Sequence, residues 1–126
     1  MYNMIIKDLI TEENMKKCLQ FFFKDMNLSV EPFTLDKKTE LPDISFEYIP
    51  ISGDFKFVLW LYTDVTFSGE NISVSICKTF DTQVLISDDD VNPYSWILIT
   101  KQGVMGTVYQ IPRDDDVFLI EEFHEK

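Results

Sequence analysis

The chain has 126 residues, a formal net charge of -11 at pH 7, and 45% hydrophobic and 14% aromatic residues. Its length predicts one domain over residues 1–126, and its hydrophobic content predicts a collapsed core. The excess of acidic side chains argues against a nucleic-acid binder and against a protein of anionic membrane surfaces, because both kinds of binding need cationic side chains.

Residues 11–27 have the clearest helical pattern. Apolar side chains recur there at spacings of three and four and share one face: Met15, Cys18, Leu19, Phe22, Phe23 and Met26. Thr11 is a suitable N-cap, and Glu12 and Glu13 favour the positive end of the helix dipole. Residues 4–10 fit the period of a helix or of a strand, and we expect a helix or turn there.

After an irregular connection at residues 28–43, apolar residues alternate with a period of two. Residues 44–50 and 55–67 are predicted strands, and the second is expected to be central because it is apolar on both faces. We expect a turn at residues 68–71 and a half-buried partner strand at 72–77, which would complete a hairpin.

Further strands are predicted at 83–87, 95–101, 104–111 and 116–123. Short connections between successive strands favour antiparallel pairing. The sequence therefore predicts the α+β class, with one or two N-terminal helices packed on an antiparallel sheet of about five to seven strands.

The two cysteines, Cys18 and Cys77, stand in apolar surroundings and are either buried thiols or one disulfide. Lys7 and Asp8 interrupt the first apolar run before it could form the core of a signal peptide. No segment approaches the roughly 18 apolar residues that a membrane span needs. We therefore expect a cytoplasmic protein.

The net charge is unevenly distributed along the chain. Residues 1–38 contain equal numbers of acidic and basic residues, so the whole excess of -11 belongs to residues 39–126. Two runs of three aspartates fall at expected turns between strands. Solvated turns favour aspartate for its local hydrogen bonds, but adjacent carboxylates also repel one another, and a basic partner would relieve that repulsion.

Aromatic side chains next to the first aspartate run could anchor such a partner, since Trp and Tyr are enriched in binding hot spots. Trp96 could equally be a core position in its strand. The predicted partner-binding residues are Asp88, Asp89, Asp90, Tyr94, Trp96, Asp114, Asp115, Asp116, Glu121 and Glu122. The two aspartate runs could alternatively meet and hold a divalent cation through their oxygen atoms.

The sequence offers little catalytic chemistry. His124 is the only histidine and stands near the end of the sequence, where we expect a surface residue rather than the general base of a Ser-His-Asp triad or Cys-His pair, and a single histidine gives no histidine set for zinc. None of the four glycines belongs to a phosphate-binding loop or a dinucleotide motif. We expect a protein that is not an enzyme and that has no cofactor and no metal.

In size, layout and charge the whole chain resembles the immunity proteins of polymorphic bacterial toxin systems, including those of contact-dependent growth inhibition. The resemblance implies a monomer that forms a heterodimer with a cognate basic toxin, commonly a nuclease, and occludes its active site through an acidic surface. Two other functions stay open. One is a phage- or plasmid-encoded inhibitor that mimics the charge of nucleic acid, and the other is a small carboxylate-dependent enzyme or cation-binding module.

Overall fold

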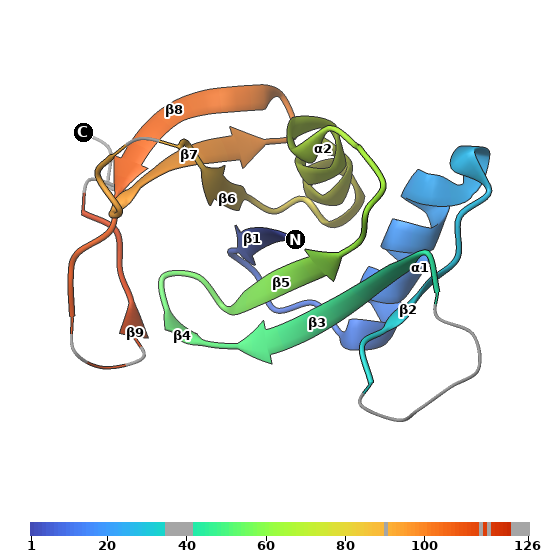
Figure 1. Ribbon diagram of the computed structural model, residues 1–126. Coiled ribbons are helices and arrows are strands. Elements are labelled where there is room, and N and C mark those ends of the chain that lie inside the picture. Colours follow the sequence, from blue (N-terminus) through green and yellow to red (C-terminus); the bar gives the residue numbers. More distant parts are fainter. Residues whose placement is uncertain (35–41, 90, 114, 116, 122–126) are drawn as a thin grey trace.

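The computed structural model describes residues 1–34, 42–89, 91–113, 115 and 117–121 (Figure 1). Its elements in chain order are β1 (Tyr2–Ile6), α1 (Glu12–Phe23), the 3-10 turn η1 (Lys24–Met26), β2 (Val30–Pro32), β3 (Ile44–Pro50), β4 (Ser52–Gly53), β5 (Phe57–Tyr62), α2 (Gly69–Phe80), β6 (Val84–Ser87), β7 (Ser95–Thr100), β8 (Gly103–Tyr109) and β9 (Val117–Phe118). A seven-stranded sheet has the order β2-β3-β5-β1-β6-β7-β8, and β4 and β9 form a separate pair. The predicted α+β class with helices on a sheet is confirmed.

Both helices connect parallel strands of the sheet. β1 lies between β5 and β6 and is antiparallel to both, so β5 and β6 run parallel and α2 crosses between them. In the same way α1 leads from β1 to β2. Because such crossovers are right-handed, the two helices lie on one face of the sheet, as Figure 1 shows.

Helix α1 forms as its sequence pattern predicts. The side chain of Thr11 accepts a hydrogen bond from the Asn14 backbone N–H at 3.1 Å, so it caps the helix. Met15, Cys18, Leu19 and Phe23 are buried, and Phe22 packs at the edge of their cluster. Met26 was expected on the same face but is 49% exposed, because α1 ends at Phe23 and the chain turns through η1.

The predicted hairpin at residues 55–77 is wrong, because residues 69–80 form helix α2. Ser68 caps this helix by accepting a hydrogen bond from the Asn71 backbone N–H at 3.1 Å. Ile72 and Ile76 are both fully buried, and their spacing of four residues suits a helix as well as it suits the even positions of a strand. The strand at 55–67 is real but ends at Tyr62, and it is central, between β3 and β1.

Residues 2–6 form the strand β1, so the expected helix or turn at residues 4–10 is wrong. β1 is buried on both faces: Met4 and Ile6 belong to the core under the helices, and Ile5 belongs to a second core on the opposite face. A strand covered on both sides is a continuous apolar run, which carries no alternation that would distinguish it from a helix.

Two pairings depart from the expected antiparallel pattern. The connection at 28–43 is not wholly irregular, because β2 forms within it and pairs parallel with β3. The strand predicted at 116–123 is reduced to β9, which pairs parallel with β4. Ile120 adds one isolated antiparallel bridge to Gln110, and residues 122–123 lie outside the described part of the chain.

The sheet separates two hydrophobic cores. The larger core lies between the sheet and the two helices, and includes Phe23, Phe46 and Leu59. The smaller core lies on the opposite face, where residues 110–121, here called the C-terminal segment, pack Phe118 and Ile120 against the sheet. Figure 1 shows this segment on the side of the sheet away from the helices.

The cysteines are separate thiols. Cys18 and Cys77 are both buried and free, so of the two alternatives the buried thiols are found. Burial raises the pKa of both thiols, that of Cys77 to about 12. Neither helix of the described residues is long and apolar enough to cross a membrane.

Candidate partner-binding surface

The first aspartate run lies in the connection between β6 and β7, where local hydrogen bonds fix the backbone. The Ser95 hydroxyl donates to Asp88 Oδ2 at 2.7 Å, and the Tyr94 backbone N–H donates to Asn92 Oδ1 at 2.9 Å. Asp89 adopts a left-handed backbone with φ of 60°, which aspartate tolerates better than most residues. Asp90 lies outside the described residues. The connection therefore holds Asp88 and Asp89 on a backbone fixed by local hydrogen bonds.

The charge of Asp89 acts on the phenol of Tyr2. Burial and, secondarily, the charge of Asp89 raise the pKa of Tyr2 to about 12. The Tyr2 ring also contacts Phe67 edge-on, with ring centroids 5.4 Å apart. The acidic connection thus borders the start of β1 and the segment that leads into α2.

The C-terminal segment is hydrogen-bonded to the connection between β6 and β7 and to the end of β8. The Gln110 backbone N–H donates to the Tyr94 carbonyl at 2.7 Å, and the Glu121 backbone N–H donates to the Tyr109 carbonyl at 2.9 Å. Tyr94 and Tyr109 are 42% and 45% exposed. The structure therefore brings Glu121 near Tyr94 through backbone pairing, whereas Glu122 lies outside the described residues.

Trp96 serves mainly to position this segment. Its indole Nε1–H donates to Gln110 Oε1 at 3.1 Å, and its ring packs edge-on against Phe118 with centroids 6.1 Å apart. The side chain is partly buried against the smaller core. This placement matches the alternative that Trp96 is a core position in its strand.

The second aspartate run is represented by Asp115, because Asp114 and Asp116 lie outside the described residues. Arg113 holds the carboxylate of Asp115 with two hydrogen bonds, of 2.7 and 2.6 Å. These bonds lower the pKa of Asp115 to about 2. Asp115 also lines a cavity of about 380 Å³ beside Pro50 and Val58. Its charge is partly compensated by Arg113, so it offers less to a basic partner than a carboxylate without such an ion pair would.

Sequence reasoning missed a second surface, formed by Phe33, Glu47, Trp60 and Tyr62 and here called the aromatic face. The apolar residues on both faces of residues 55–67 were interpreted only as the mark of a central strand. Trp60 and Tyr62 belong to neither hydrophobic core. The signal was present in the neighbouring strand, because β3 pairs Glu47 with Trp60 and Ser45 with Tyr62, and polar partners mark a face that is exposed to solvent.

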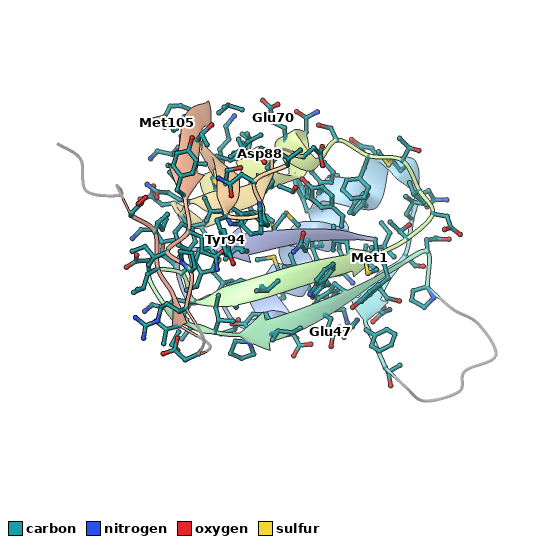
Figure 2. All side chains as sticks on the ribbon, turned by 60° about the vertical axis from the view of Figure 1, so that its left-hand side comes forward. Met1, Glu47, Glu70, Asp88, Tyr94 and Met105 are labelled. Carbon is teal, nitrogen blue, oxygen red and sulfur yellow. The ribbon has the colours of Figure 1, made fainter. Side chains whose placement is uncertain are left out.

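The figures separate the two surfaces. Figure 2 shows Asp88 in the upper part of the molecule, Tyr94 near its middle and Glu47 at its lower edge. Within the ranges that the structure describes, no group of three or more His, Cys, Asp and Glu residues could hold a metal ion. His124 lies beyond those ranges.

The chain matches no protein family, and no curated protein and no solved structure is significantly similar to it.

Proposed function

We propose that this chain is an immunity protein that binds a cognate basic toxin, a nuclease in the simplest case, and neutralises it by covering its active site. The observation that carries the proposal is the acidic loop between β6 and β7. Asp88 and Asp89 are presented there on a hydrogen-bonded backbone, and Tyr94 of the same connection is 42% exposed. An aromatic ring next to carboxylates suits a cationic protein surface.

The distribution of charge supports the same proposal. The helix side carries its own lysines, and Lys16 pairs with Glu31 at 3.1 Å while Lys24 lies 4.5 Å from the ring centroid of Phe21. The negative field therefore belongs to the sheet and its connections rather than to α1. Such a field speeds the association of a basic partner and selects its orientation.

The test is the association of the purified chain with the basic toxin domain encoded beside its gene. Association rates would be measured while the ionic strength rises from about 0.01 to about 0.15 M. We expect the rate to fall about tenfold or more, because electrostatic steering is screened by salt. Inhibition of the toxin's activity in the same samples would show whether binding covers the active site.

Matched variants locate the field. Asp88→Asn with Asp89→Asn removes two charges from the β6–β7 connection, and asparagine can still accept the Ser95 hydrogen bond. Glu13→Gln with Asp25→Asn removes two exposed charges from the helix side. The first pair should slow association several-fold more than the second pair does. The proposal would be overturned if the toxin did not bind the wild-type chain. It would also be overturned if the two double variants associated with the toxin at equal rates.

A further inference from the structure

The aromatic face is a continuous group of rings on the face of β3 and β5 that is turned away from the helices, because Phe46 and Leu59 take the alternate positions under the helices. The ring of Tyr62 lies between the other two, with centroid distances of 5.4 Å to Phe33 and 6.4 Å to Trp60. The planes of Trp60 and Tyr62 are nearly parallel, at 11°. Their positions are fixed because β5 is paired on both sides, with β1 and with β3.

These rings contribute little to either core. Phe33 is 46% exposed, and Trp60 and Tyr62 are partly exposed. Aromatic rings that gather on one face and keep part of their area in contact with solvent are typical of interaction sites. The C-terminal segment covers the opposite end of this sheet face, where its Phe118 packs against Trp96.

Glu47 supplies a negative charge at the edge of the rings. Its Oε1 accepts a hydrogen bond from the Tyr62 hydroxyl at 2.6 Å, and its register partner on β5 is Trp60. Among the described residues, no lysine or arginine forms an ion pair with Glu47. A carboxylate held beside stacked rings thus lies ready for a cation from another molecule.

We propose that the aromatic face binds an arginine side chain of a basic protein partner, with the guanidinium stacked on Trp60 and Tyr62 and hydrogen-bonded to Glu47. A planar guanidinium can stack on a ring and donate to a carboxylate at the same time, which a lysine ammonium cannot do. The proposal rests on the proposed function, because it names a second contact for the same basic partner. It adds an anchor on β5 to the steering field of the β6–β7 connection.

The two tryptophans provide a built-in comparison for the test. The indole N–H of Trp60 lies on the aromatic face, whereas that of Trp96 is bonded to Gln110 in the C-terminal segment. Two-dimensional ¹⁵N NMR of the full chain would follow both indole signals during titration with a short arginine-containing peptide with blocked ends. The same peptide with citrulline in place of arginine is the neutral control.

We expect the arginine peptide to shift the Trp60 indole signal and the Glu47 and Tyr62 amide signals in a saturable way. The Trp96 signal should stay in place, and the citrulline peptide should have no effect. Glu47→Gln, which keeps an acceptor for the Tyr62 hydroxyl, should weaken binding at least about fivefold, because charged hydrogen bonds are about twice as strong as neutral ones. Glu70→Gln, the same change in the first turn of α2, should leave the affinity unchanged.

Shifts confined to Trp96 and the β6–β7 connection would overturn this inference and leave the proposed function intact. No saturable shift with the arginine peptide, or equal shifts with the citrulline peptide, would also overturn it. The toxin provides the separate readout. If Trp60→Ala leaves the affinity of the chain for the toxin unchanged while Asp88→Asn with Asp89→Asn weakens it, the aromatic face does not bind the toxin. If the toxin does not bind the wild-type chain, the proposed function fails on its own.

Discussion

Gly53 and Phe118 lie in direct backbone contact where β4 pairs with β9. The Asp54 backbone N–H donates to the Phe118 carbonyl at 2.7 Å, and a Cβ atom at Gly53 would overlap the backbone of Phe118. Gly53 also has a φ of 112°, a backbone conformation that residues other than glycine rarely adopt. This close approach holds the C-terminal segment over the smaller core.

Gly53→Ala should therefore destabilise the protein strongly. Gly103 is the matched control, because its φ of 113° is nearly the same but no neighbouring atom lies within 4 Å of the position that a Cβ would take. Gly103→Ala should cost about 1 kcal/mol from backbone strain alone. Gly53→Ala should cost at least about twice as much, because the added methyl group must also displace Phe118. Urea unfolding of the two variants gives the comparison, and equal losses would contradict the close contact.

The N-cap of α2 tests whether residues 69–80 form a helix, which the sequence pattern did not reveal. Ser68→Ala removes the hydrogen bond to the Asn71 N–H and should lower the free energy of unfolding by about 1 kcal/mol. Thr11→Ala, at the corresponding position of α1, should have a similar cost. Ser68→Asp should retain the stability, since aspartate is an equally good N-cap. If Ser68→Ala is neutral in thermal unfolding, residue 68 does not cap a helix.

Tyr2 should make stability depend on pH in the alkaline range. Its pKa is raised from 10.0 to about 12 in the folded protein. Below pH 10 both states keep the phenol proton, so the contribution of the buried phenol is fully present; it is lost as the pH rises through about 12. Wild type should therefore lose stability more steeply than Tyr2→Phe over this range. Parallel curves of unfolding free energy against pH would refute the expectation.

The ion pair of Arg113 and Asp115 should affect both the stability of the protein and the titration of Asp115 at low pH. In the folded chain the pKa of Asp115 is lowered from 3.8 to about 2, first of all by its hydrogen bonds to Arg113. The stabilisation by this carboxylate is thus present above pH 3.8 and lost as the pH falls through about 2. Carbon-detected NMR titration of Asp115 should give a midpoint near 2, and Arg113→Gln should return it toward 3.8. An unchanged midpoint in the variant would rule out control by Arg113.

Helices and strands that bury a single face could be predicted from the sequence. α1 has a single apolar stripe and an unambiguous cap at Thr11, and β3 alternates cleanly, so both were predicted correctly. α2 was missed because Ile72 and Ile76 satisfy two periods at once. What distinguishes the helix is its second buried pair, Ser73 and Cys77, which lies on the same face only if the chain turns every 3.6 residues.

Part of the candidate surface could also be predicted from composition. Asp88, Asp89 and Tyr94 are on an ordered loop, as expected for residues between two strands. The neutralisation of Asp115 by Arg113 was not predicted from the aspartate run, although the two residues are close in sequence. The aromatic face depends on the register of two strands that were both predicted, because it is the pairing of β3 with β5 in this register that places Glu47 beside Trp60.

The central position of β1 has a consequence for folding on the ribosome. Both partners of β1, β5 and β6, are synthesised after it, and the second of them ends at Ser87. The middle of the sheet therefore cannot close until about two thirds of the chain has emerged, and the contacts that close it are distant in sequence. Until then the apolar segment Met4–Ile6 can pair only with β5, so one edge of this buried strand stays open during synthesis, and unpaired strand edges of this kind favour aggregation.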